Sequence, residues 1–287
     1  MVSRIAVIKH VGPKLVPFLE SVFIFFVLYP LKSESNLFFL IIKCMPIIAL
    51  MIFVLSNGFN LKFEYSYSRR IFTGLFFSMI GDACLVYPEE FFIFGVISFG
   101  IAHIIYLTAF GIKPLNYKFA LALSVLALPV TAFYIPFLQN YVLKLIVPIY
   151  MALLLSMLWR AVSRLQIFNK EVKWTWTKLC CSIGAFFFVV SDSVLSFDFF
   201  IYPVPYSHPI IMFTYYAAQL GIALSVVDSD VDYEVNDLVI QHNDLINGIR
   251  RIYNYLKSIY FEDNLEVINL NESITVNKKA YGNSKRD

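Results

Sequence analysis

Residues 37–55 read LFFLIIKCMPIIALMIFVL, an almost unbroken apolar run in which Lys43 is the only charge. The hydrocarbon core of a bilayer is about 30 Å thick, and an α-helix rises about 1.5 Å per residue, so roughly 20 apolar residues cross it. Pro46 is tolerated in such a helix, because neighbouring helices can satisfy the backbone groups that a proline leaves unbonded. This segment therefore predicts a membrane-spanning helix.

Seven further segments have the same character, and short polar hinges separate them. Hydrophobic residues make up 59% of the 287-residue chain and charged residues only 15%, whereas a soluble domain carries about 25% charged residues. We therefore predict an all-α polytopic membrane protein, a bundle of about eight transmembrane helices that occupies residues 1–227. The seven other predicted spans are Leu15–Leu31, Ile71–Tyr87, Phe91–Gly111, Tyr117–Leu138, Tyr141–Trp159, Trp174–Phe197 and Pro209–Val227.

Basic residues are distributed unequally between the two sets of loops. Cytosolic loops of membrane proteins carry an excess of Lys and Arg. The loops on the opposite side offer essentially Lys32. An even number of spans then places both termini in the cytosol. The basic residues on the predicted cytosolic side are Arg4, Lys9, Lys14, Lys62, Arg69, Arg70, Lys113, Lys118, Arg160, Arg164, Lys170 and Lys173.

The segment 228–287 differs from the rest of the chain, because it contains 11 acidic and 7 basic residues. We interpret it as an acidic cytosolic tail. Apolar residues recur at helical spacing in its middle, at Leu238, Leu245, Ile249 and Leu256. This pattern is compatible with an amphipathic helix that docks on the helical body or lies on the membrane surface. From Asn271 onward the composition is polar and aperiodic, which predicts a disordered end.

Ionisable side chains inside the predicted spans cost roughly 2.5–3.5 kcal/mol each, so each is a candidate functional residue. Asp82 lies 12 residues after Arg70, and Asp192 lies 18 residues after Trp174. Along a helix these separations are roughly 18 and 27 Å, which places both carboxylates in the half of the membrane away from the cytosol. The polar candidates within the spans are Glu20, Lys43, Asp82, His103, Asp192 and Gln219.

Three further residues are expected at the same depth as the two aspartates. Lys43 and Tyr215 each lie six residues into a span that enters from the non-cytosolic side, and Gln219 follows Tyr215 by one turn on the same face. These five side chains predict one polar pocket, although an Asp–Lys ion pair alone would also serve simply to hold helices together. His103 and Tyr106 share a face of the fourth span, and His103 is expected to lie deeper.

Six short motifs follow one another in a fixed order along the predicted spans. Together they resemble the YhhN-like family of membrane proteins over roughly residues 15–230, and the acidic tail is not part of that family pattern. No single motif is specific, but their order and spacing carry the resemblance. The motifs are KCMP at 43–46, GDACL at 81–85, FG at 94–95 followed by Phe99, AHIIY at 102–106, SDS at 191–193 and YYAAQ at 215–219.

The resemblance implies a lysoplasmalogenase, an enzyme that hydrolyses the vinyl-ether bond of lysoplasmalogens. The products would be a fatty aldehyde and a glycerophosphoethanolamine or glycerophosphocholine. The family also implies an integral protein of the endoplasmic reticulum, with a lysophospholipid substrate, membrane lipids as surroundings and no cofactor.

Such a reaction suits two carboxyl groups in one desolvated pocket. Cleavage begins with protonation of the vinyl-ether β-carbon, and water then captures the oxocarbenium ion, as in glycosidases that use two carboxylates. We expect Asp82 and Asp192 to be this catalytic pair, without assigning the acid to either one. Lys43 would orient or ionise one of them or meet the substrate phosphate. The other expected substrate-binding residues are His103, Tyr106, Tyr215 and Gln219.

Two other classes of function remain open from the residues alone. A zinc-dependent lipid hydrolase would need about three converging ligands, whereas His103 is the only histidine clearly inside a span and the cysteine spacing resembles no metal site. A transporter or receptor would use the buried charges to bind an ion or a ligand. Nothing in the sequence resembles a nucleic-acid-binding motif, so no nucleic-acid partner is expected.

Overall fold

The computed structural model describes residues 4–29, 36–57, 66–111, 115–138, 140–165 and 176–227, together with Arg250. The chain divides into two compact units, Met1–Asp230 and Val231–Asp287, and the helices with assigned bounds all belong to the first. The amphipathic helix and the disordered end that were predicted for 228–287 lie outside the described residues, apart from Arg250.

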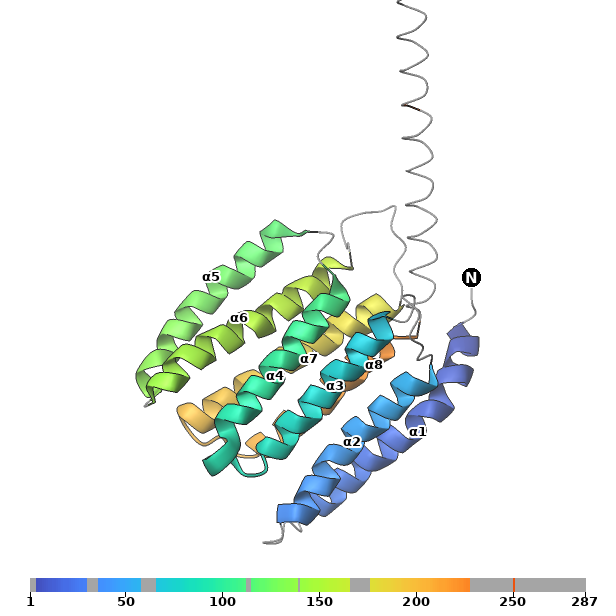
Figure 1. Cartoon of the computed structure of the whole chain (residues 1–287), viewed down its shortest axis with the longest axis horizontal. Helices are drawn as coiled ribbons and strands as arrows, with labels where there is room; N and C mark the ends of the chain where they lie inside the picture. Colours follow the sequence, from blue (N-terminus) through green and yellow to red (C-terminus); the bar gives the residue numbers. More distant parts are fainter. Residues whose placement is uncertain are drawn as a thin grey trace, which may run out of the picture. The chain divides into compact units, whose positions relative to one another are not determined.

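The described part of the first unit consists of helices and their connections, without a β-strand (Figure 1). The prediction of an all-α polytopic bundle is therefore confirmed. The elements are α1 (Arg4–Leu28), α2 (Asn36–Ser56), α3 (Ser66–Cys84), α4 (Pro88–Phe110), α5 (Tyr117–Tyr134), the short 3-10 helix η3 (Ile135–Phe137), α6 (Tyr141–Ser163), α7 (Trp176–Phe200) and α8 (Ser207–Leu224).

The helices pack mainly on their neighbours in the chain, and a few long-range pairs close the bundle. Helices α1, α2, α3 and α4 pack one on the next, α6 packs on both α4 and α7, and α8 packs on α7, α2 and α3. Helices α1 and α5 lie at opposite edges, and α5 packs chiefly against α6 (Figure 1). The interior is therefore built from α2, α3, α4, α7 and α8, with α6 closing one side.

Six of the described helices are long and apolar enough to cross a membrane, namely α1, α2, α4, α5, α6 and α7. Helices α3 and α8 are less apolar. Helix α3 begins with the polar run Ser66–Arg70, and α8 begins with Ser207–Pro209. Both have many buried residues, so other helices cover much of their surface in place of lipid. An interior helix can therefore carry the polar side chains that a lipid-facing helix cannot.

Most predicted span boundaries agree with the helices to within a few residues, but the first helix begins well before the predicted first span. Helix α1 begins at Arg4, eleven residues before Leu15, and it continues through Pro13 and Pro17. The apolar pattern begins later than the helix and so could not mark its start. Lys14 donates hydrogen bonds to the Ser56 carbonyl at 3.1 Å and to Asn57 Oδ1 at 2.8 Å, which ties α1 to the end of α2.

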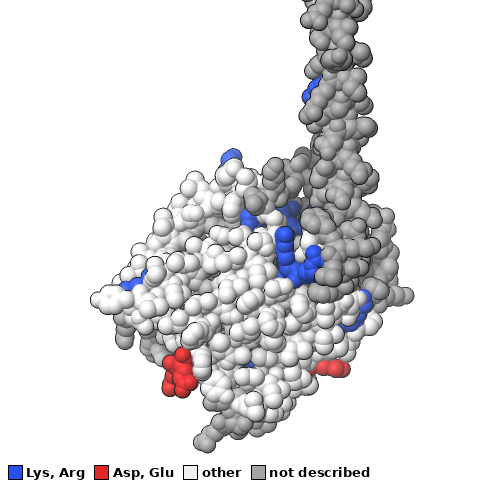
Figure 2. Space-filling model, viewed as in Figure 1, with Lys and Arg blue, Asp and Glu red and all other residues white. Residues whose placement is uncertain are grey.

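The outer surface is apolar, as a lipid environment requires. Large hydrophobic side chains such as Phe23, Leu128 and Phe213 are exposed by 62–72%. Figure 2 shows a broad uncharged band on one face of the described body, with most Lys and Arg atoms toward the upper end of the view and the Asp and Glu atoms toward the lower end. This separation of charge matches a bundle that presents its two ends to different sides of a membrane.

A tight connection between α3 and α4 positions the first candidate residue. Helix α3 ends at Cys84, and Pro88 opens α4 at its first position, where a proline costs no hydrogen bond. Glu89 and Glu90 occupy the first turn of α4, where negative charge favours the helix dipole. Asp82 thereby lies in the last turn of α3, close to one end of the bundle.

Candidate functional site

Asp82 and Lys43 form a buried ion pair between α3 and α2. Their side chains are 3% and 5% exposed, and Lys43 Nζ lies 3.5 Å from Asp82 Oδ1. Lys43 also donates a 3.1 Å hydrogen bond to the backbone carbonyl of Asp82. The last carbonyls of a helix lack the usual partners, so the ammonium satisfies one of them as well as the carboxylate. Two interactions thus fix the lysine at the end of α3.

Helix α8 completes this group with two adjacent tyrosines. Tyr215 donates its hydroxyl to Asp82 Oδ2 at 2.5 Å, and Tyr216 donates to the backbone carbonyl of Lys43 at 2.8 Å. A hydrogen bond to a carboxylate is short and strong, particularly where water is excluded. Consecutive residues of α8 therefore hold both members of the ion pair.

A second pair of polar side chains lies one helical turn from Tyr215. Tyr106 on α4 donates to Gln219 Oε1 on α8 at 2.9 Å, and both side chains are fully buried. Gly74 on α3 permits this approach, because a Cβ there would lie 2.2 Å from the Tyr106 ring. Two nearby polar atoms, Gln219 Nε2 and Ser78 Oγ, are buried without a hydrogen-bond partner among the described residues.

Asp192 on α7 belongs to a separate hydrogen-bonded group. Tyr150 on α6 donates to Asp192 Oδ2 at 2.5 Å, and His103 Nε2 on α4 lies 3.0 Å from the Tyr150 hydroxyl and 3.9 Å from the same carboxylate oxygen. Because Tyr150 gives its single proton to Asp192, it accepts one from His103 Nε2. The chain of donors thus runs from the imidazole through the phenol to the carboxylate.

Two phenylalanine rings, Phe99 and Phe188, lie between the Asp82 group and the Asp192 group. Phe188 contacts His103 and Tyr215, with ring centroids 4.8 and 5.6 Å apart, and Phe99 lies 5.9 Å from Tyr215. Gly81, next to Asp82, makes room for Phe99, because a Cβ there would come within 2.6 Å of the ring. Phe188 therefore connects the Asp82 group, through Tyr215, with the Asp192 group, through His103.

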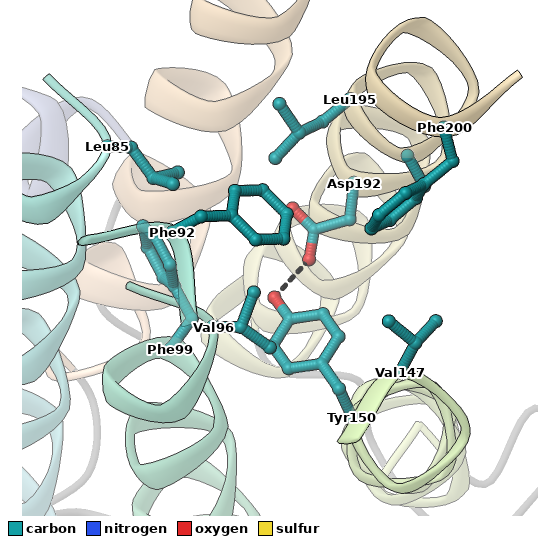
Figure 3. Close-up of a pocket in the computed structure, with 10 residues that line it drawn as sticks. Leu85, Phe92, Val96, Phe99, Val147, Tyr150, Asp192, Leu195 and Phe200 are labelled. Atoms are coloured by element: carbon teal, nitrogen blue, oxygen red, sulfur yellow. Dashed lines mark hydrogen bonds between the residues drawn. The ribbon is translucent and has the colours of Figure 1, made fainter. Parts of the chain in front are cut away.

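Asp192 faces a small cavity between α4, α6 and α7, whereas Asp82 does not line it. The cavity has a volume of about 40 Å³, which is room for water and far too little for a lipid. Figure 3 shows Asp192 and Tyr150 pointing toward one another across it, with Phe92 and Leu195 beside them. The lining residues are Leu85, Phe92, Val96, Phe99, Val147, Tyr150, Asp192, Leu195, Ser196 and Phe200.

The structure groups the residues that the sequence singled out in a partly different way. It brings Lys43, Asp82 and Tyr215 together and places Tyr106 against Gln219. It pairs His103 with Asp192 through a tyrosine. The single polar layer expected from the sequence is thus divided into neighbouring hydrogen-bonded groups by phenylalanine rings.

Sequence reasoning missed Tyr150, which bridges His103 and Asp192. The chain has 18 tyrosines, and most of those in a membrane protein lie in interfacial belts or packing positions. One signal was available, because Tyr150 lies deep in a span where its hydroxyl needs a partner. Glu20, by contrast, is exposed on α1, away from these groups.

The described residues contain no group of three His, Cys, Asp or Glu side chains arranged to hold a metal ion. The ionisable side chains that the structure brings together are Lys43 with Asp82 and His103 with Asp192. Such groups can hold or transfer a proton.

Comparison with known proteins identifies relatives along most of the chain. Bovine (Bos taurus) lysoplasmalogenase TMEM86A is 40% identical over 230 residues, which cover 80% of this chain and 95% of the relative. The human (Homo sapiens) protein of the same name is 38% identical over the same shares, and lysoplasmalogenase TMEM86B of Sus scrofa is 34% identical over 77% of this chain and 89% of its own length.

No solved structure matches this chain. The family pattern matches residues 38–226, from the start of α2 to just beyond α8, and so includes every residue of the two carboxylate groups. The chain belongs to the YhhN family.

Proposed function

We propose that this protein is a lysoplasmalogenase, which hydrolyses the vinyl-ether bond of lysoplasmalogens. The observation that carries the proposal is the 40% identity to a bovine lysoplasmalogenase over 95% of that protein's length. The products are a fatty aldehyde and glycerophosphoethanolamine or glycerophosphocholine. Two buried carboxylates in neighbouring groups support the same conclusion, because the reaction needs both a proton donor and a group that activates water.

The reaction consumes one water molecule and returns the proton that starts it. Protonation of the β-carbon of the vinyl ether gives an oxocarbenium ion, and water adds to the carbon that is bonded to oxygen. The resulting hemiacetal collapses when its C–O bond to glycerol breaks, and the glycerol oxygen takes up the proton that the hydroxyl releases. An enzyme therefore needs an acid, a base and a dry site that holds one water.

We assign the acid and base roles to Asp82 and Asp192. The reacting water would occupy the cavity beside Asp192. The cavity has room for water, and the Asp192 carboxylate and the Tyr150 phenol both line it. Phe99, which lines the same cavity, packs against Gly81, the residue before Asp82. The positive charge of Lys43 and the Tyr215 hydroxyl hold Asp82 in position.

The remaining polar residues position these groups. His103 and Tyr150 orient the Asp192 carboxylate, and Tyr106 and Gln219 form a hydrogen-bonded pair beside Tyr215. Gln219 is fully buried on the same face of α8 as Tyr215, so it supports Tyr215 from one helical turn away.

The proposed function is tested with purified protein and two lysolipids that differ in a single bond. The vinyl-ether lysolipid should release fatty aldehyde, whereas the saturated ether analogue should release none because its β-carbon cannot be protonated to an oxocarbenium ion. If well-folded protein releases aldehyde from neither lipid, in detergent or in vesicles, the proposal is rejected.

We further propose that the protein lies in the endoplasmic reticulum membrane with both termini in the cytosol. The excess of Lys and Arg on one set of loops supports this orientation. Tags placed at the two termini should be digested by protease in intact microsomes. Protection of either tag would reverse or reject the assignment.

A further inference from the structure

An apolar groove is lined by residues of α2, the end of α3 and the beginning of α4. It has a volume of about 480 Å³ and is open to the surface of the body. Its lining is almost wholly hydrophobic. The residues that line it are Leu40, Ile41, Cys44, Met45, Ile48, Met79, Ile80, Ala83, Cys84, Tyr87 and Phe91.

The groove lies directly beside the candidate catalytic residues. Cys44 follows Lys43 in the sequence, and Ala83 and Cys84 follow Asp82, so the same helical turns contribute to the ion pair and to the groove wall. A molecule in the groove would therefore be separated from the ion pair only by the backbone of these two turns and their small side chains.

The chemistry of the groove suits a hydrocarbon chain. Its lining is almost wholly hydrophobic, and its volume of about 480 Å³ falls within the range of roughly 300–1,000 Å³ typical of pockets that bind small apolar molecules. At the end of the groove, Tyr87 and Phe91 flank the connection between α3 and α4. Aromatic residues at this depth suit the boundary at which a lipid head group meets its chain.

We propose that this groove binds the hydrocarbon chain of the lysolipid substrate, with the ether end at the connection between α3 and α4, where Cys84 and Phe91 line the groove and the next residues, Leu85 and Phe92, line the Asp192 cavity. This inference rests on the proposed function for the identity of the lipid and extends it by naming the chain-binding surface. Because surrounding lipid is as apolar as the groove, transfer from bilayer to groove gains little hydrophobic free energy. The selectivity of the groove for its lipid then depends on the shape of the groove. A variant whose larger side chain fills part of the groove should bind long hydrocarbon chains less well than short ones.

Ile48 and Ile52 provide a matched pair of variants. Both lie on α2 and are exposed, by 43% and 56%, and only Ile48 lines the groove. Ile48→Trp should fill the groove and raise KM for a hexadecenyl lysoplasmalogen by about tenfold, the scale on which hydrophobic pockets discriminate. It should leave KM for an octenyl lysoplasmalogen and kcat for both nearly unchanged. Ile52→Trp should behave as wild type with both lipids.

Photolabelling provides a readout that does not depend on turnover. A saturated ether lysophosphoethanolamine with a diazirine in its chain should label the peptides that contain residues 44–48 and 79–91. Excess unlabelled saturated ether lysophosphoethanolamine should compete, and diacyl phosphatidylcholine should not. The variant Ile48→Trp should lose this labelling while Ile52→Trp keeps it.

The outcomes distinguish this inference from the proposed function. Competed labelling of the groove by a protein that releases no aldehyde would support the chain site and reject the lysoplasmalogenase. Aldehyde release with identical kinetics in the two tryptophan variants, or labelling that diacyl lipid competes equally well, would overturn the chain site and leave the enzyme. The latter labelling result would mean that the groove holds ordinary bilayer lipid.

Discussion

Each candidate carboxylate accepts a hydrogen bond from a tyrosine on another helix. Tyr215 meets Asp82 and Tyr150 meets Asp192, both at 2.5 Å. A phenol supplies one directed donor at small entropic cost and adds an apolar ring to the surrounding packing. The same device therefore positions both carboxylates in a region with little water.

Replacing Tyr150 with Phe should lower kcat while the protein remains folded. The variant removes the donor that orients Asp192 and interrupts the link to His103, but it keeps the ring. We expect a loss of about tenfold, as for a hydrogen bond worth about 1.4 kcal/mol. Tyr134→Phe is the matched control, because Tyr134 is buried on α5, away from the site. Equal kcat in the two variants would remove Tyr150 from the site.

The Lys43–Asp82 pair permits stability and activity to be separated. Lys43→Met leaves a buried carboxylate without its counter-charge, and we expect about 3 kcal/mol of destabilisation, visible as a lower Tm in detergent. The double variant Lys43→Met, Asp82→Asn should recover most of this stability and remain inactive. Recovery of activity in the double variant would show that the pair only holds α2 and α3 together.

At the scale of helices, the closest packing occurs between α7 and α8. A Cβ at Gly184 would lie 2.7 Å from the Ala218 carbonyl oxygen, and a Cβ at Gly221 would lie 2.6 Å from the Cys180 carbonyl oxygen. Small residues at facing positions let membrane helices approach closely. This contact fixes Asp192 on α7 relative to Tyr215 on α8.

Gly184→Ala should therefore destabilise the protein, although alanine favours helices over glycine. The added methyl group meets backbone atoms that cannot move aside, and we expect a cost of about 1–3 kcal/mol. Gly12→Ala is the control, because nothing lies within 4 Å of a Cβ at Gly12 on α1. Thermal unfolding in detergent should show a lower Tm for the first variant alone. A Tm at or above that of Gly12→Ala would contradict the close contact.

The helices were predictable from the sequence to different degrees, and burial explains the difference. Apolar length identified α2 to within one residue at each end and α4 to within three, because lipid demands hydrophobic side chains along such a span. It gave no signal for the first part of α1, whose helix continues beyond the apolar segment. Helices α3 and α8 were also predicted as helical segments, although they are not among the six helices that are long and apolar enough to cross a membrane.

At the scale of the whole molecule, depth along each helix was predictable and lateral position was not. Counting residues placed Lys43, Asp82 and Tyr215 at one level, and the structure brings these three into contact. The same counting could not show that Phe188 lies between His103 and Tyr215, because this depends on the rotation of each helix about its axis.

In the proposed mechanism, two carboxylates from different helices, Asp82 and Asp192, act together in one reaction. Aldehyde release from a vinyl-ether lysolipid should be measured for Asp82→Asn, Asp192→Asn and the control Glu20→Gln, which changes an exposed carboxylate on α1. We predict that kcat falls by at least about 100-fold in each aspartate variant and stays at the wild-type value in the control, with all three proteins folded. Near-normal turnover by either aspartate variant would contradict the two-carboxylate mechanism.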